Sequence, residues 1–185
     1  MSTLILVTGY PATGKTSLAK AISTKLQIPL FTKDGIKEIL FDTLGYEKDR
    51  EELKIYSHAA YGIMFSHLDE ELKAQRHCIL ESNFTEKSTP YIKEVVAKNL
   101  NSFVVQIICF ANPATTVQRF FDRQANGDRH KGHRDDLEDR EKFTALVSNG
   151  PIVLDLDGPK IFVDTTRFQA VSYVKIIHDL AKYTT

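Results

Sequence analysis

A glycine-rich run near the N-terminus has the residue types and spacing of a phosphate-binding loop. It reads Gly-Tyr-Pro-Ala-Thr-Gly-Lys-Thr from Gly9 to Thr16. The two glycines let backbone N–H groups turn toward phosphate oxygens, an approach that a Cβ atom would obstruct. Lys15 adds a charge that can reach the terminal phosphates, and the Thr16 hydroxyl can bind magnesium. We interpret the run as a P-loop, because a plain glycine-rich turn does not explain the Gly-Lys-Thr at the entrance of a helix.

Two carboxylates follow later apolar runs of the chain. Asp34 comes after Leu30–Thr32, and Glu81 comes directly after Cys78–Leu80. A carboxylate at the carboxyl end of a parallel strand can face both the P-loop and an incoming hydroxyl group, so Asp34 is the candidate general base. The alternative is that Asp34 only caps the helix that it begins. Glu81 stands where an acidic residue of the Walker B type helps to order magnesium; substrate binding, base catalysis and a solvated strand end are its alternatives.

Arginines form a third group of candidates. Arg119 and Arg123 lie four residues apart in a helical pattern, and Arg129 follows in a polar, basic segment at about residues 124–137. Guanidinium groups can neutralise the charge that spreads over a phosphoryl group during transfer. Arg119 could equally be a solvated residue on a helix surface. Because apolar residues almost vanish from the polar segment, we expect it to be a mobile surface loop.

The elements that must position these residues alternate between strand and helix. Apolar runs predict strands at 3–8, 30–32, 78–80, 103–110 and 160–164. Helical spacing and capping residues predict helices that begin after Lys15, at Asp34, near Leu53, at Thr89-Pro90, at Asn112-Pro113, at Leu137 and at Val171. This alternation indicates an α/β fold, with a parallel sheet covered by helices on both faces. A chain of 185 residues is the size of a single domain.

Charge and composition restrict the classes of partner. Twenty-four basic residues balance twenty-four acidic ones, so the chain has no general attraction to nucleic acid or to a membrane surface. Cys78 and Cys109 each fall in an apolar strand pattern, which predicts buried thiols and no disulfide. The sequence shows neither a signal peptide nor an apolar stretch of membrane-spanning length, so a cytoplasmic protein is expected.

Together these features resemble the small P-loop kinases. The features are the motif at 9–16, Lys33-Asp34-Gly35-Ile36 after the second strand, Arg119-x-x-x-Arg123 and a lid-like polar segment. The group includes gluconate, shikimate and adenylate kinases, 5′-hydroxyl polynucleotide kinases, chloramphenicol phosphotransferase and zeta-toxin-like kinases, with an ATP-binding domain of the AAA type. The resemblance covers nearly the whole chain. It implies a three-layer P-loop NTPase fold with strand order 2-3-1-4-5 and a helical lid.

The resemblance also implies roles for particular residues. ATP would be the phosphoryl donor and Mg²⁺ its metal ion, held by Thr16 with Glu81 as the second candidate. A helical segment at about 34–76 would bind the acceptor, and the polar segment would be the lid. Arg119 would stack on adenine, which Thr165 would help to line. The nucleotide-binding set is Gly9, Tyr10, Pro11, Ala12, Thr13, Gly14, Lys15, Thr16, Ser17, Arg119, Arg123 and Thr165, and the catalytic set is Lys15, Asp34, Glu81 and Arg123.

We therefore predict an ATP-dependent kinase that transfers the γ-phosphoryl group to a hydroxyl group of a small-molecule acceptor. Two alternatives stay open: a P-loop ATPase or switch that acts with a protein partner, and a kinase for the 5′-hydroxyl end of a nucleic acid. Zero net charge argues against nucleic acid as a partner. No Asn-Lys-x-Asp signature for guanine occurs. Small kinases of this kind are often monomers or homodimers.

Overall fold

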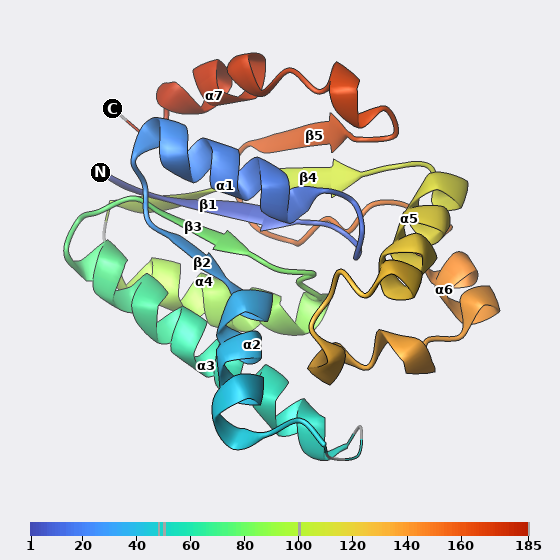
Figure 1. Cartoon of the computed structure of the whole chain (residues 1–185). Coiled ribbons are helices and arrows are strands. Elements are labelled where there is room, and N and C mark those ends of the chain that lie inside the picture. Colours follow the sequence, from blue (N-terminus) through green and yellow to red (C-terminus); the bar gives the residue numbers. More distant parts are fainter. Residues whose placement is uncertain (48, 50, 100, 185) are drawn as a thin grey trace.

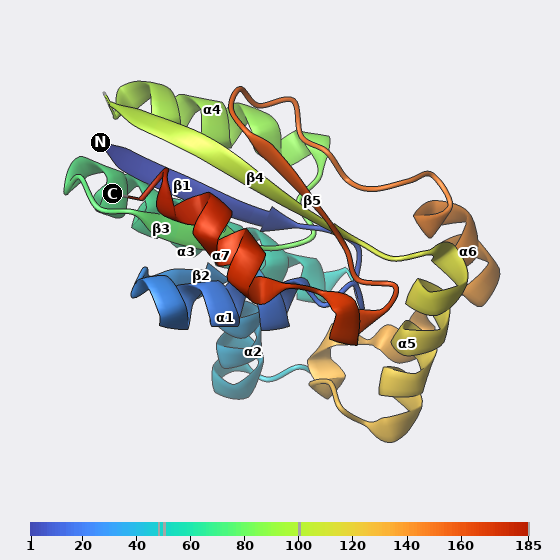
Figure 2. The ribbon, with the colours of Figure 1, turned by 90° about the horizontal axis from the view of Figure 1, so that it is seen from above.

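A parallel sheet forms the middle of the protein, and helices pack on both of its faces (Figures 1 and 2). The computed structural model describes residues 1–47, 49, 51–99 and 101–184. The strand order is β2-β3-β1-β4-β5, which confirms the predicted fold class and order. The strands are β1 (Ser2–Thr8), β2 (Leu30–Thr32), β3 (Cys78–Glu81), β4 (Ser102–Phe110) and β5 (Lys160–Asp164).

The helices form two layers and a group beyond the carboxyl ends of the strands (Figure 2). One layer contains α1 (Lys15–Leu26) and α7 (Tyr173–Ala181), and the other contains α3 (Glu52–Lys73) and α4 (Thr89–Lys98). The remaining α-helices are α2 (Lys33–Leu44), which follows β2 directly, and α5 (Pro113–Asn126) and α6 (Arg140–Val147), which lie beyond the strand ends. Short 3-10 turns are η1 (Glu86–Ser88), η2 (Lys131–His133), η3 (Asp135–Leu137) and η4 (Phe168–Ala170).

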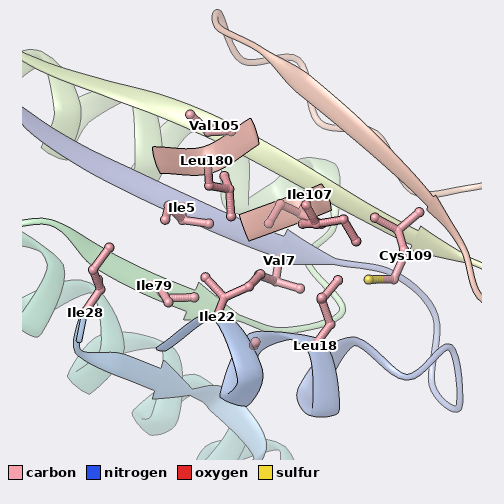
Figure 3. Close-up of a cluster of buried hydrophobic side chains, with 13 residues drawn as sticks. Ile5, Val7, Leu18, Ile22, Ile28, Ile79, Val105, Ile107, Cys109 and Leu180 are labelled. Atoms are coloured by element: carbon pink, nitrogen blue, oxygen red, sulfur yellow. The ribbon is translucent and has the colours of Figure 1, made fainter. Parts of the chain in front are cut away.

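Successive residues of β1 point to opposite layers, as the period of a strand requires. Ile5 and Val7 face α1 and α7 (Figure 3), whereas Leu4 and Leu6 face α3 and α4. All four are fully buried, and burying each such side chain stabilises the fold by about 1.5–3 kcal/mol. The core between the sheet and the layer of α1 and α7 also contains Leu18, Ile22, Ile79, Val105, Ile107 and Leu180. The strand that carries the P-loop is therefore buried along its whole length.

The two cysteines lie in different layers of this core. Cys109 packs with the α1 and α7 layer, and Cys78 packs with the α3 and α4 layer. Both thiols are free and buried, and burial raises the pKa of each to about 12. The predicted buried, unpaired thiols are confirmed.

Helix α2 begins with a cap that frees the candidate base. The Thr32 hydroxyl accepts a hydrogen bond from the Gly35 N–H at 3.2 Å, so Thr32 is the N-cap. The alternative that Asp34 caps this helix is wrong. Asp34 lies in the first turn, where the helix dipole favours a negative charge.

The other helix starts lie at the predicted positions or within three residues of them. Asn112 caps α5 as predicted, since its side chain accepts from the Thr115 N–H at 2.7 Å. Thr89 was predicted to be a cap but is the first residue of α4, because η1 already turns the chain before it. Helix α6 begins at Arg140 rather than Leu137, because Asp139 caps it.

A glycine fixes the close approach of the P-loop to the neighbouring strand. Gly9 has φ 151°, and a Cβ there would lie 2.3 Å from the Cys109 carbonyl oxygen. We expect Gly9→Ala to lower the free energy of unfolding by about 2 kcal/mol or more, measured by urea denaturation. In the control Gly62→Ala, the added Cβ meets nothing within 4 Å inside α3, so this variant should gain about 0.5–1 kcal/mol. Equal stability of the Gly9→Ala and wild-type proteins would contradict the close approach.

Candidate active site

The P-loop joins β1 to α1 at the carboxyl edge of the sheet. Gly14, the residue before α1, has a left-handed φ of 74°, and a Cβ there would lie 2.3 Å from the Phe168 ring. Among the described residues, no side chain caps α1, so the N–H groups of its first turn can bind an anion. The Lys15 ammonium group lies 3.4 Å from the Tyr10 carbonyl oxygen, above the same loop. The loop therefore has the shape and the donors of a phosphate site.

Glu81 is buried against the P-loop. It is the last residue of β3 and lies in register with Val7 of β1. Thr16 Oγ1 donates to Glu81 Oε2 at 3.0 Å, and Lys15 Nζ lies 3.6 Å from Oε1. Burial raises the pKa of the Glu81 carboxyl, and the Lys15 charge opposes that rise. A solvated strand end is thus the wrong alternative for this residue, which is 4% exposed.

Asp34 faces the same cavity as the P-loop. Its Oδ1 lies 3.3 Å from Lys33 Nζ, and its Oδ2 accepts a hydrogen bond of 2.9 Å from Arg129. Burial disfavours the charged carboxylate, but the charges of Arg129 and Lys33 outweigh it and hold the pKa of Asp34 well below its usual range. This P-loop cavity, of about 260 Å³, is lined by Ala12, Gly14, Lys15, Thr16, Ser17, Asp34, Arg119, Arg123 and Arg129.

Arg119 is half-buried and hydrogen-bonded to the backbone. Its guanidinium donates to the Thr165 carbonyl oxygen at 3.0 Å and to the Thr166 carbonyl oxygen at 3.1 Å. The Thr165 hydroxyl lies within hydrogen-bond distance of two backbone oxygens, 2.9 Å from Thr13 and 3.0 Å from Phe110. Arg119 and Thr165 therefore tie the chain after β5 to α5 and to the P-loop. Arg119 is therefore a half-buried residue fixed to the backbone, not a free arginine on the helix surface.

The other two arginines share one carboxylate. Arg123 donates to Asp135 Oδ2 at 3.4 Å, and Arg129 Nε lies 3.3 Å from the same oxygen. Asp135 belongs to η3, so the polar segment supplies its own counter-charge. The structure thus brings Arg119, Arg123 and Arg129 together in the lining of the P-loop cavity.

The polar segment docks along one side of α2. Arg129 pairs with Asp34, His133 Nε2 lies 2.8 Å from Glu38, and His130 Nε2 lies 3.1 Å from Asp42. The three acids are spaced by four residues, which places them on one face of the helix. These contacts attach the segment that was predicted to be a mobile surface loop.

An apolar contact lies under these ion pairs. Phe41 of α2 is fully buried and stacks on the His130 ring at a centroid distance of 5.2 Å. A Cβ on Gly132 would lie 2.5 Å from the Phe41 ring, so only glycine allows this approach. Phe41 was predicted neither as core nor as a docking residue; the signal in the sequence is an apolar residue within the acidic face of a helix.

Comparisons with known proteins agree with this geometry. A family described as an AAA domain matches residues 4–145. The chain belongs to this family of P-loop proteins. A candidate kinase from Chloroflexus aurantiacus J-10-fl is 34% identical, with TM-score 0.90, over 100% of this chain and 99% of that one. The resemblance to the small P-loop kinases is therefore confirmed. No curated protein matches the sequence.

More distant structures share the fold of this AAA-domain protein. Kti12 from Chaetomium thermophilum, in complex with ADP-AlF3, has TM-score 0.63 and 16% identity over 98% of this chain and 99% of that one. A sugar kinase from Janibacter sp. HTCC2649 has TM-score 0.52 and 11% identity over 98% and 92%. At these identities the likeness concerns the fold alone.

Two residues beside the site were given no role in the sequence predictions. Lys33 is buried beside Asp34, and its ammonium group lies 5.8 Å from the centre of the Tyr61 ring. Phe168 closes over Gly14 from the turn after β5. Neither follows from sequence spacing, because the contacts with Tyr61 and Gly14 join distant elements.

The part of the chain that the structure describes contains no helix with the length and apolar character of a membrane span.

His133 is held in its neutral form. Arg129 Nη2 lies 3.0 Å from His133 Nδ1. Because a guanidinium group can only donate, Nδ1 accepts this hydrogen bond, so the ring proton lies on Nε2, which donates to Glu38. Burial, together with the Arg129 charge, lowers the pKa of His133 to about 3. An unfolded histidine takes up its proton near pH 6.5.

This difference predicts a loss of stability in acid. Between about pH 6.5 and pH 4 the unfolded chain binds more protons at His133, so the free energy of unfolding should fall as the pH falls. The stabilisation from Asp34 is lost only below about pH 4, outside this window. Urea denaturation across the window should show a flatter profile for His133→Gln than for the wild type.

The control variant is His178→Gln, whose side chain is 88% exposed on α7. It should keep the wild-type slope. Burial also lowers the pKa of His77, but that contribution remains in both variants. Identical slopes for His133→Gln and His178→Gln would contradict the neutral, buried state of His133.

Proposed function

We propose that this AAA-domain protein is an ATP-dependent kinase that transfers the γ-phosphoryl group to a hydroxyl group of a small molecule. The observation that carries the proposal is the P-loop cavity, where Lys15 and Thr16 share one space with Asp34 and Arg129. A hydrolytic switch needs only a phosphate site and an activated water, whereas a phosphotransferase needs a group beside that site to accept the proton of a second substrate. Family and neighbours agree with a nucleotide-dependent kinase.

Each residue has a separate part in the proposed reaction. The acceptor oxygen attacks the γ-phosphorus, the bond to the bridging oxygen breaks, and ADP leaves. Lys15 and the first turn of α1 hold the phosphates, and Asp34 takes the proton of the hydroxyl group. Arg123 and Arg129 neutralise the charge on the transferring group.

Arg129 links ATP binding to the activation of the acceptor by Asp34. In the structure it pairs with Asp34, and a paired carboxylate of low pKa is a poor base. The phosphates of ATP would compete for the same guanidinium, because both anions face one cavity. Drawing Arg129 toward phosphate would leave Asp34 free to meet the acceptor and would raise its pKa.

The remaining assignments complete the proposal. We assign acceptor binding to the helical segment at about 34–76 and closure to the polar segment as the lid. Asp34 and its neighbours begin the first segment, and Arg129 belongs to the second.

Two buried free thiols are consistent with a reducing cytoplasm. We propose a monomer or a homodimer.

The residues beside the P-loop fit a magnesium ion. Mg²⁺ prefers hard oxygen ligands, and the exposed Thr16 hydroxyl meets the buried Glu81 carboxylate at 3.0 Å. Thr16 would bind the ion directly, and Glu81 would hold it directly or through water. When bound, magnesium supplies charge neutralisation between the phosphate oxygens.

The kinase proposal predicts that ATP turnover requires both an acceptor and the residues Lys15 and Asp34. ATP consumption should depend on an acceptor drawn from hydroxylated metabolites, nucleosides, nucleoside monophosphates, aminoglycosides and 5′-hydroxyl oligonucleotides. Lys15→Ala should reduce the acceptor-dependent rate by about 100-fold or more, and Asp34→Asn by about 10²–10⁴-fold. The exposed Lys20→Ala on α1 serves as the control and should leave the rate unchanged. Turnover that only a protein partner stimulates would instead identify an ATPase or switch.

The magnesium assignment predicts a change in metal dependence. In Glu81→Gln we expect the Mg²⁺ concentration for half-maximal turnover to rise by about tenfold, because the amide cannot supply the charge of a carboxylate. Magnesium titrations at fixed ATP measure this shift. Glu86→Gln, an exposed acid of η1, is the matched control. An unchanged magnesium requirement in Glu81→Gln would remove this residue from the metal site.

A further inference from the structure

A second cavity adjoins the P-loop cavity on the far side of its arginines. It measures about 460 Å³ and is lined by residues of α5, of the polar segment and of the chain after α2. Arg123 and Arg129 line both cavities, so the two spaces share these side chains as part of their walls. We call the second space the basic cavity.

The charge of the basic cavity is positive. Four cationic side chains line it, against the two acidic side chains of Glu47 and Asp135, an excess of two positive charges in a chain of zero net charge. Tyr46 adds an aromatic wall. The four cationic residues are Arg123, Arg129, Lys131 and Arg134. A space with this lining favours a small ligand that carries anionic oxygens.

The shared arginines have donors to spare. Among the described residues, Arg123 Nε and Arg129 Nε are buried and have no hydrogen-bond partner. Arg129 Nε lies 3.3 Å from Asp135 Oδ2 but lacks the alignment of a hydrogen bond. A buried donor of a charged group without a hydrogen-bond partner is unfavourable, so an anion that draws these guanidinium groups toward it and pairs with them is bound more tightly.

We propose that the basic cavity binds an anionic group, phosphate or carboxylate, of the phosphoryl acceptor, which makes the acceptor a small anionic hydroxy compound. The inference rests on the proposed kinase function. The guanidinium of Arg129 reaches from Asp34 to the basic cavity, so an anion held there lies one side chain away from the base. Lys131 and Arg134 do not line the P-loop cavity and would recognise the acceptor without touching ATP.

The test separates this cavity from the P-loop. The full-length protein is first saturated with Mg²⁺ and β,γ-methylene-ATP, so that added anions cannot bind at the P-loop. Calorimetric titrations then compare inorganic phosphate, glycerol 3-phosphate and glycerate with uncharged glycerol. We expect at least one anion to bind about tenfold or more tightly than glycerol, and the two organic anions distinguish phosphate from carboxylate.

Variants locate the binding. Lys131→Gln should weaken anion binding by about threefold, and Lys131→Gln with Arg134→Gln by about tenfold, while the affinity for β,γ-methylene-ATP stays unchanged. Lys175→Gln, an exposed lysine of α7, should bind anions like the wild type. Circular dichroism verifies that each variant is folded, and the single variant decides the result if the double variant is not.

Several results would overturn the inference. They are equal affinity for glycerol and all three anions, equal anion affinity in Lys131→Gln and Lys175→Gln, and binding of a 5′-hydroxyl oligonucleotide but of no small anion. If these occur while Lys15→Ala still abolishes acceptor-dependent turnover, the kinase function stands and only the anionic acceptor is lost. Anion binding without phosphoryl transfer to any acceptor would contradict the kinase function itself.

Discussion

The burial of β1 on both faces is the constraint on which the rest of the structure depends. Because each residue from Leu4 to Val7 is fully buried between two helical layers, the strand cannot shift without exposing apolar surface. Its neighbour β3 is held in the same register, so Glu81 ends opposite Val7. The P-loop therefore starts from a fixed point, and Thr16 and Lys15 lie 3.0 Å and 3.6 Å from the carboxylate of a different strand.

A second level of organisation is electrostatic and spans the chain. Asp34 and Arg129 are 95 residues apart in sequence, yet they neutralise each other in a half-buried position. Each charge also has a second partner: Lys33 contacts Asp34, and Asp135 contacts Arg129. A phosphate could take the place of either carboxylate in this network, because phosphate also pairs with guanidinium groups. This property suits the proposed kinase site, which would receive two substrates and exclude water between them.

The parts of the fold that the sequence predicts are those with local causes. The P-loop, the five strands and the capped start at Asn112 follow from short-range spacing. Thr32 and Asp34 are both good capping residues, and only the position where β2 ends decides between them. The partners of Arg119 lie 46 and 47 residues away, so a helix-surface arginine and a structural one look alike in sequence. The docking of the polar segment was missed for the same reason: its ion pairs and the Phe41 contact exist only after α2 and α5 are placed.

The acidic face of α2 has a mechanical consequence. Asp34 and Asp42 are eight residues apart, which corresponds to about 12 Å along the helix axis. The polar segment touches this face at both ends and in the middle, with the Phe41 ring packed beneath Gly132. Lifting the segment away from Asp34 therefore brings an aromatic ring into contact with water as well as breaking ion pairs. Exposure of the Asp34 carboxylate at the start of α2 is therefore coupled to exposure of the Phe41 ring near its other end. The polar segment should detach from α2 as a unit rather than one contact at a time.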